Sequence, residues 1–281
     1  MIRETVEITD LSFDGRGIGR CADGRVVFAS GTLPGDFAEL RISGEGRSLT
    51  GRLVELKKPS EHRIEPDCPY FGRCGGCSLR NFAYEAQLAW KEDFVRNALV
   101  RIGGLQDPVV RPARGMNHPY RYRNKAVFAV EEGVPGFFAS GSRELVPIDD
   151  CLLLEQEICD ALDAKRAKLS KNCTKLTFRS SHFGEVMTVK EYSDGNITAD
   201  RRVLEDIIET DMASLKLEVG PQSFYQVNPR QTSVLYSIVQ EYANPKPSDT
   251  LIDLYCGAGS IGLSMAGRCG RVIGVESFKP A

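Results

Sequence analysis

The 281-residue sequence predicts a multidomain protein that combines an all-β barrel, an α+β domain and the beginning of an α/β domain. Three observations predict these parts. Residues 1–58 contain short strand-like runs separated by turns, residues 59–220 mix strand and helix patterns, and residues 221–281 end in a strand, a glycine turn, a helix and another strand. The length alone is sufficient for about two domains of ordinary size.

The composition is that of a soluble globular protein, with 42% hydrophobic and 26% charged residues. The N-terminal stretch MIRETVEITD alternates polar and apolar residues, and no apolar run approaches the roughly 18 residues of a membrane span. We therefore expect a cytoplasmic protein. The nine cysteines are odd in number and no export signal accompanies them, so we expect reduced thiols or metal ligands.

Residues 1–58 are predicted to form a small closed barrel of the OB kind, because turns recur about every 8 to 12 residues. The predicted strands are 5–11, 25–30, 36–43 and 48–57. The segment GRGIG carries Gly15, Gly17 and Gly19. No strand–turn–helix unit surrounds it, so these are predicted to be turn glycines and not a nucleotide-binding loop.

A polar, proline-containing linker, KKPSEHRIEPDCP, leads from the barrel into the central domain. From about Asn81 the pattern becomes helical, because Leu88, Val95, Leu99 and Ile102 fall on one helical face. The glycines of the following RIGG sequence are typical of a helix end.

The rest of the central domain, 59–220, is predicted to be α+β. The predicted strands are 125–130, 175–181, 185–192 and 214–220, and the predicted helices lie near 152–168 and 201–209. After it, Asn228 followed by Pro229 is an N-cap and first-turn pair, which predicts a helix over 230–243.

One stretch of the central domain is strongly basic, although the whole chain has a formal net charge of −2. Its basic residues are Arg111, Arg114, Arg121, Arg123 and Lys125, with no acidic residue among them. His118, Tyr120 and Tyr122 are interleaved with these charges. Guanidinium groups beside aromatic rings suit phosphates and unpaired bases, so the stretch is a candidate RNA contact. A solvated loop that leads into a strand is the alternative.

Three cysteines follow the linker with the spacing C-x5-C-x2-C: Cys68, Cys74 and Cys77. A tetrahedral thiolate site needs a fourth ligand, and Cys151 is the best candidate. Zinc and an iron-sulfur cluster both accept four thiolates. Three ligands from one glycine-rich loop and one from far away favour the cluster, because structural zinc sites usually pair two short knuckles.

The end of the sequence contains a strand, a glycine turn and a helix, in TLIDLYCGAGSIGL. Gly257, Gly259 and Gly262 form G-x-G-x-x-G, and Glu276 follows 19 residues after the first glycine, as in a dinucleotide site. Asp253, four residues before that glycine, would repel a pyrophosphate. The same carboxylate would attract the cationic sulfonium of S-adenosylmethionine, and Glu276 could accept hydrogen bonds from its ribose. The charges therefore favour the methyl donor over a dinucleotide.

Taken together, these motifs resemble the bacterial RNA 5-methyluridine methyltransferases, and most closely those that act on 23S ribosomal RNA. The resemblance rests on DLSFDGRGIGR, the cysteine loop, YRYRNKAVFAV, IDDC, SFYQVNP and DLYCGAGSIGL, and it covers nearly the whole chain. It implies an N-terminal RNA-binding TRAM domain, a central domain and the start of a class I methyltransferase domain. Ribosomal RNA is the implied partner, and a monomer is expected.

The resemblance also implies roles for individual residues. Cys68, Cys74, Cys77 and Cys151 would hold a 4Fe-4S cluster, and Arg121, Arg123 and Lys125 would contact RNA. Residues at positions where the family contacts S-adenosylmethionine are Gln226, Tyr255, Ser260 and Glu276, beside Asp253, Gly257 and Gly259 of the turn. In such enzymes a cysteine thiolate adds to carbon 6 of uracil, carbon 5 takes the methyl group, and a carboxylate removes the carbon 5 proton.

The sequence departs from the family at its end, because the nucleophilic cysteine and the basic glutamate of the family lie in later strands and loops. We therefore expect a truncated methyltransferase domain and an inactive chain, with no catalytic residue among the 281. Three alternatives stay open: a transfer RNA 5-methyluridine enzyme, a non-catalytic RNA-binding iron-sulfur module, and a flavin or nicotinamide oxidoreductase, which Asp253 disfavours.

Overall fold

The computed structural model describes residues 2–277, which divide into two compact units. The first unit comprises 2–115 together with 138–146, and the second comprises 116–137 together with 147–277. This division by contacts differs from the three predicted domains, 1–58, 59–220 and 221–281, and those boundaries stay a prediction. Among the described residues, no helix is both long and apolar enough to cross a membrane.

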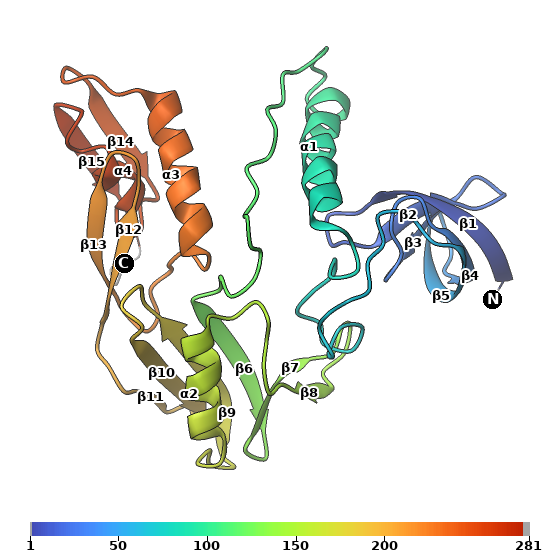
Figure 1. Ribbon diagram of the computed structural model, residues 1–281, viewed down its shortest axis with the longest axis horizontal. Helices are drawn as coiled ribbons and strands as arrows, with labels where there is room; N and C mark the ends of the chain where they lie inside the picture. The colour runs from blue at the N-terminus through green and yellow to red at the C-terminus, as the bar shows by residue number, and fades with distance from the viewer. Residues whose placement is uncertain (1, 278–281) are drawn as a thin grey trace. The chain divides into compact units, whose positions relative to one another are not determined.

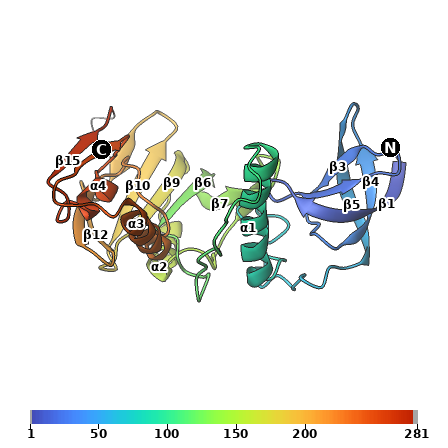
Figure 2. The same ribbon diagram turned by 90° about the horizontal axis from the view of Figure 1, so that it is seen from above.

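The first unit begins with a closed barrel of five strands in the order β1-β2-β3-β5-β4 (Figure 2). The strands are β1 (Ile2–Leu11), β2 (Gly17–Arg20), β3 (Val26–Ala29), β4 (Phe37–Ser43) and β5 (Ser48–Lys58). All neighbours are antiparallel except β3 and β5. Alternate residues of the strands fill the barrel interior, and the largest of them, Ile8 and Leu40, are fully buried.

The prediction that Gly17 and Gly19 are turn residues is wrong, because both lie in β2. A Cβ on Gly17 would meet Thr32 Oγ1 at 2.0 Å, and one on Gly19 would meet Val6 Cγ1 at 2.5 Å. These glycines are therefore required by close packing inside the barrel. Gly15, with φ of 82°, does lie in the turn before β2.

The linker and the helix α1 (Tyr84–Arg101) complete most of the first unit. The linker runs beside the residues that precede α1, since Ile64 N donates to Asn81 O and Ala83 N donates to His62 O. Trp90 of α1 donates from Nε1 to Asp10 Oδ1 at 3.3 Å. None of the described residues of α1 is fully buried, but Ala86 and Trp90 are partly buried and pack against the core cluster of Leu11, Leu33 and Phe82.

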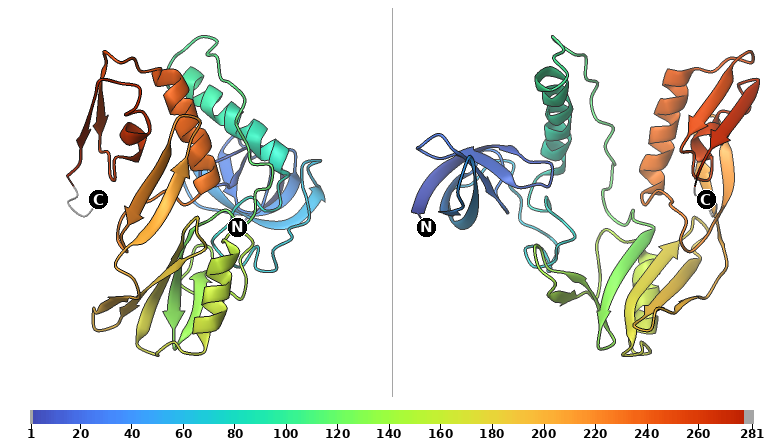
Figure 3. Two further views of the ribbon diagram at one scale, coloured as in Figure 1. Left: turned by 60° about the vertical axis from the view of Figure 1, so that its left-hand side comes forward. Right: turned by 180° about the vertical axis from the view of Figure 1, so that it is seen from behind.

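The second unit contains most of a six-stranded sheet in the order β11-β10-β9-β6-β7-β8. The strands are β6 (Lys125–Glu131), β7 (Val134–Phe138), β8 (Leu145–Pro147), β9 (Cys173–Ser180), β10 (Val186–Tyr192) and β11 (Ile197–Ala199). Helix α2 (Gln156–Arg166) lies against β9 and β10, as Figure 3 shows, and buries Ile158, Cys159 and Leu162 there. Burial raises the pKa of the Cys159 thiol to about 11, consistent with a core residue.

A hairpin of β12 (Leu204–Glu209) and β13 (Ser214–Val219) follows. The prediction of a helix over 201–209 is therefore wrong. Leu204, Asp206 and Ile208 are buried and their neighbours are more exposed, which is the period of two expected of a strand. The hairpin packs on α3 (Pro229–Ala243), which begins as predicted: Gln231 N donates to the Asn228 side chain and Pro229 occupies the first turn.

The described chain ends in a β-α-β unit of β14 (Thr250–Leu254), α4 (Ser260–Ser264) and β15 (Arg271–Val275) (Figure 1). The two strands are parallel, with Leu254 paired with Val275, as the sequence predicts. Their carboxyl ends lie side by side, so the turn after β14 meets Glu276 at one edge of the sheet.

Candidate functional site

The turn between β14 and α4 is the centre of the candidate cofactor site. Three of its residues have left-handed backbone conformations: Tyr255 with φ of 59°, Gly257 with φ of 55° and Gly259 with φ of 74°. Tyr255 is not a glycine, and its side chain is 89% exposed. Such strain in a non-glycine residue is typical of functional turns, because it fixes a backbone path that a relaxed turn would not take.

Both predicted acids accept hydrogen bonds from backbone here, Glu276 from the turn and Asp253 from the helix α4 that follows it. Gly257 N donates to Glu276 Oε2 at 2.9 Å, and Gly262 N donates to Asp253 Oδ2 at 2.9 Å. One carboxylate thus comes from β14 and the other from the residue directly after β15. The structure brings Asp253, Gly257 and Glu276 together as the sequence predicted.

Ser260 begins α4 and is held by a residue that the sequence did not single out. Its Oγ lies 2.6 Å from the hydroxyl oxygen of Tyr236 on α3. Tyr236 is buried, and this burial raises the pKa of its phenol. The contact fixes the start of α4 against α3. In the sequence, the one signal for this contact with Ser260 is the position of Tyr236 on the apolar face of the predicted helix.

Gln226 lies in the segment that precedes α3, and this segment is bound to the central sheet of the same unit. Asn124 donates from its backbone N to Val227 O at 3.0 Å and from Nδ2 to Gln226 O at 3.1 Å. Arg179 of β9 donates from Nη2 to Ser223 O at 2.8 Å. Asn124 and Arg179 therefore hold the backbone on both sides of Tyr225.

Asn124 and Arg179 are themselves buried, with 1% and 2% of their surfaces exposed. Among the described residues, Asn124 Oδ1 and Arg179 Nη1 find no hydrogen-bond partner. Burial lowers the pKa of the Arg179 guanidinium, and Lys125, its cross-strand neighbour, likewise has a pKa lowered first by burial and then by Arg179. Sequence analysis missed Asn124 and Arg179, because an asparagine just before one strand and an arginine within another carry no spacing that distinguishes them.

The three predicted RNA contacts have different surroundings. Arg121 forms a two-pronged ion pair with Asp150, with both nitrogen–oxygen distances at 2.7 Å, and also donates to Cys151 O at 3.0 Å. This ion pair raises the pKa of Arg121, so the guanidinium is charged. Its N–H groups are used by the Asp150 carboxylate and by carbonyl groups of residues 150–154. Arg123 and Lys125 are half-buried at the start of β6.

The cysteine loop is ordered by its own backbone within the first unit. Cys74 N donates to Tyr70 O at 2.9 Å, Gly75 N donates to Phe138 O at 2.9 Å, and Gly76 N approaches Cys74 Sγ at 3.4 Å. A Cβ on Gly75 would lie 2.9 Å from Phe138 O, so this glycine is required by the close approach of two backbones.

The structure does not gather these cysteines into a metal site. Across residues 2–277, no group of three or more histidine, cysteine, aspartate or glutamate side chains is arranged to hold a metal ion. Cys68, Cys74 and Cys77 are partly exposed in the first unit, and Cys151 belongs to the second. The predicted convergence of four thiols is therefore not confirmed.

Comparison with known proteins gives the site a family context. Residues 3–54 match the model of the TRAM domain. An uncharacterized RNA methyltransferase of Bacillus cereus is 31% identical over 96% of this chain and 70% of its own length. Another, from Caldanaerobacter subterraneus, is 32% identical over 98% of this chain and 73% of its own length.

A solved structure shares the fold. It is the Pyrococcus abyssi tRNA (uracil-54, C5)-methyltransferase in complex with S-adenosyl-L-homocysteine, with a TM-score of 0.65 and 20% identity over 93% of this chain and 70% of that one. The N-terminal barrel is thus a TRAM domain, and this chain shares the fold of that solved structure. With relatives above 30% identity that it covers for most of their length, this chain belongs to the RNA methyltransferase family.

Proposed function

We propose that this protein uses S-adenosylmethionine to methylate carbon 5 of a uridine in RNA, with ribosomal RNA as the substrate. The observation that carries the proposal is that Glu276 is held by the strained glycine turn and Asp253 by the helix that follows it. The fold neighbour holds S-adenosyl-L-homocysteine, the product of the same donor, which supports this cofactor.

The residues present fit this cofactor by charge. Each of the two carboxylates uses one oxygen to fix the turn, and each keeps a negative charge next to it. A dinucleotide would place its anionic pyrophosphate beside Asp253, whereas the methyl donor carries a sulfonium and an ammonium group. Two unit charges about 4 Å apart attract by roughly 1 to 4 kcal/mol, depending on how far water screens them.

The experiment compares two ligands that differ by one methyl group and one charge. Isothermal titration calorimetry of wild type and Asp253→Asn would measure affinity for S-adenosylmethionine and for S-adenosylhomocysteine. Asparagine still accepts the hydrogen bond from Gly262 N, so the turn is kept. We expect the affinity for the cationic ligand to fall about 5- to 30-fold, and that for the neutral thioether to fall much less.

Asp249→Asn is the matched control, because Asp249 caps the turn before β14 by accepting from Lys246 N and lies outside the glycine turn. It should leave both affinities unchanged. Equal losses for the two ligands in Asp253→Asn would contradict the charge argument, and failure of wild type to bind either ligand would refute the assignment of the cofactor.

The RNA substrate is proposed from the TRAM domain and the relatives, and Arg123 and Lys125 are the proposed contacts. The fold neighbour acts on transfer RNA, which makes transfer RNA the second candidate. Transfer of a radiolabelled methyl group to isolated 23S ribosomal RNA and to transfer RNA in parallel reactions would decide between them.

The chemistry proposed for the family reaction needs groups beyond the cofactor turn. A thiolate adds to carbon 6 of uracil, carbon 5 then becomes nucleophilic enough to take a methyl group, and a base removes the carbon 5 proton so that the thiolate can leave. We assign neither the thiolate nor the base in this chain. The thiol of Cys256 lies in the turn, 3.6 Å from Gly257 O, and packs against Gly274.

We also propose a 4Fe-4S cluster on Cys68, Cys74, Cys77 and Cys151. The donor set fits, because four thiolates suit a cluster and Gly76 N already approaches Cys74 Sγ. A bound cluster would tie the cysteine loop to the segment that carries Cys151. Iron and acid-labile sulfide should be found in protein purified without oxygen and be lost in Cys74→Ser, whereas Cys269→Ser should retain both. Absence of iron and sulfide from wild type would refute the cluster.

A further inference from the structure

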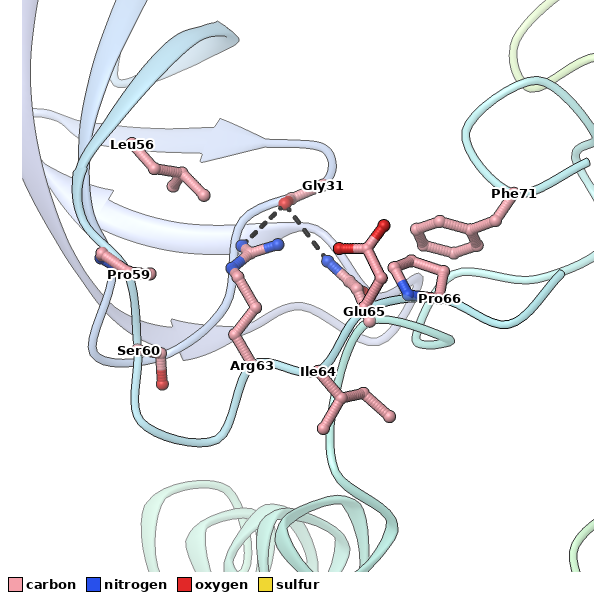
Figure 4. A pocket seen from close by; sticks show the side chains of 10 residues that line it. Gly31, Leu56, Pro59, Ser60, Arg63, Ile64, Glu65, Pro66 and Phe71 are labelled. Atoms are coloured by element: carbon pink, nitrogen blue, oxygen red, sulfur yellow. Dashed lines mark hydrogen bonds between the residues drawn. The ribbon is translucent and has the colours of Figure 1, made fainter. Parts of the chain in front are cut away.

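The first unit contains a cavity of about 490 Å³ that none of the site residues above lines. It is bounded by the end of the barrel, by the linker and by the cysteine loop. Its lining residues include Gly31, Arg63, Glu65, Pro66, Phe71 and Asn81 (Figure 4). The volume lies within the range of about 300 to 1,000 Å³ that is usual for small-ligand pockets.

Asn81 gives this cavity an unsatisfied hydrogen-bond acceptor. The residue is only 3% exposed, and its Oδ1 has no hydrogen-bond partner among the described residues. Its Nδ2 donates to Gly31 O at 3.4 Å, and Arg63 Nη2 donates to the same carbonyl at 3.0 Å. With Nδ2 directed at Gly31, the amide oxygen is left without a partner in the described part of the chain and is itself buried, so a proton donor in the cavity would reach it only if the Asn81 side chain turned toward the cavity.

The cavity does not suit an anion, although it contains an arginine. The Arg63 guanidinium is paired with the fully buried carboxylate of Asp36, which also accepts from Leu33 N and Ser60 N. Glu65 then adds a second carboxylate, and Figure 4 shows it directed toward Gly31 while the Ile64 side chain points the other way. A phosphate would be repelled here, whereas a neutral group with N–H donors would be attracted.

Phe71 and Pro66 supply a flat apolar wall. Phe71 lies in the cysteine loop between Cys68 and Cys74, and in Figure 4 its ring is next to the Pro66 ring at the side of the cavity where Glu65 lies. Aromatic rings bind unpaired bases by stacking, with about 1 to 3 kcal/mol per base. An aromatic wall beside two acceptor groups is the arrangement that recognises a base by its edge.

We propose that this cavity binds one unpaired RNA base that carries an exocyclic amino group, so that cytosine, adenine or guanine is accepted and uracil is rejected. The amino protons would be donated to Glu65 and, once the Asn81 side chain turns toward the cavity, to its Oδ1, whereas the carbonyl at the equivalent position of uracil would face the same two acceptors. This inference rests on the proposed function, because it assigns a contact for the RNA. It predicts that the enzyme reads a base other than the one that it methylates.

The probes are fluorescein-labelled 12-nucleotide homopolymers of cytidine, adenosine and uridine, bound to the full chain and followed by fluorescence anisotropy. Cytidine and uridine differ at the position that faces the two acceptors, where an amino group replaces a carbonyl. We expect wild type to bind the cytidine and adenosine oligomers about 5- to 100-fold more tightly than the uridine oligomer.

Two variants test the proposed roles of Glu65 and Phe71. Glu65→Gln replaces one oxygen by a donor, so the preference for cytidine over uridine should shrink at least about threefold. Phe71→Leu removes the stacking surface and should weaken cytidine and adenosine binding about 5- to 100-fold. The matched controls are Glu61→Gln, the same charge change on an exposed residue of the linker, and Phe183→Leu, an exposed phenylalanine of the second unit.

The outcomes separate this inference from the proposed function. Equal affinities for the three oligomers, or a preference that Glu65→Gln and Glu61→Gln alter equally, would overturn the base site even if S-adenosylmethionine binds as expected. A base preference that depends on Glu65 and Phe71 would support it, even if the cofactor experiment fails. If no oligomer binds at all, both the base site and the RNA partner are overturned.

Discussion

Gly262 leaves little room for a side chain beside the carboxylate of Asp253. A Cβ at this position would lie 3.0 Å from Asp253 Oδ2 and 3.1 Å from Val272 Cγ1. We predict that Gly262→Ala displaces the carboxylate, lowers the free energy of unfolding by about 1 to 3 kcal/mol and weakens S-adenosylmethionine binding. Urea denaturation and calorimetry would measure the two effects.

Gly267→Ala is the control for this substitution, because a Cβ at Gly267 would meet nothing within 4 Å. Both quantities should stay near their wild-type values in that variant. If Gly262→Ala binds the cofactor as tightly as Gly267→Ala does, the contact between Gly262 and Asp253 has no role in positioning the carboxylate.

Glu155 is a buried acid whose titration should affect stability. Burial raises its pKa in the folded protein, although Ser180 Oγ donates to its carboxylate. The pKa of Glu155 is higher in the folded protein than in the unfolded chain. At pH values between these two pKa values the unfolded chain binds fewer protons, so the free energy of unfolding falls as pH rises from one to the other. We predict that Glu155→Gln removes this loss, so that its unfolding free energy relative to wild type increases from about pH 4 to pH 7.

Urea denaturation at several pH values would test this prediction. The exposed Glu131, replaced by glutamine, is the control for the loss of a carboxylate from the same compact unit. A Glu155→Gln difference that is constant from pH 4 to pH 7 would show that folding does not shift the pKa of this carboxyl group, and one that decreases would show that the carboxylate is stabilised as an anion in the folded protein.

At the scale of elements, the start of α3 joins the cofactor segment to a helix. Asn228 accepts a hydrogen bond from Gln231 N at 3.1 Å and follows Gln226 by two residues. We predict that Asn228→Ala lowers the free energy of unfolding by about 1 kcal/mol. Asn228→Asp should retain the cap and favour the helix dipole, so its loss should be smaller. Thermal and urea unfolding of both variants would show whether Asn228→Asp is the more stable of the two.

The elements also show what the sequence could and could not predict. Glycines, the Asn228–Pro229 pair and strong periodicity correctly predicted α3, β14 and β15. Residues 201–209 were misread as a helix, because RRVLEDIIE contains charged residues that fit either period, and only burial of Leu204, Asp206 and Ile208 shows the strand. The strand β2 was missed because glycines that allow close packing and glycines that allow turns are identical in sequence.

The candidate site also contains residues that the sequence could predict and residues that it could not. Asp253, Gly257 and Glu276 were predictable, because local order along a β-α-β unit brings them to one edge. Asn124, Arg179 and Tyr236 were not, since each is positioned by contacts with segments far away in the sequence. The fourth cysteine is the hardest case, because its pairing with the loop was inferred from residue type and family likeness alone.

At the scale of the whole molecule, the barrel and the cofactor turn belong to different compact units, so damage to one should spare the other. Leu40 is fully buried in the barrel core. We predict that Leu40→Ala lowers the stability of the barrel by about 2 to 5 kcal/mol and weakens binding of RNA, while the affinity for S-adenosylmethionine changes less than about twofold.

The two affinities would be measured on the same preparation by anisotropy and by calorimetry, with Leu40→Met as the volume-conserving control. Hydrogen exchange would show whether the loss of protection is confined to the first unit. Because the barrel core contains only residues of the first unit, a parallel loss of cofactor affinity could not arise from its local packing. Such a loss would mean that the two units fold as a single cooperative structure, and RNA and methyl donor would then be expected to bind cooperatively.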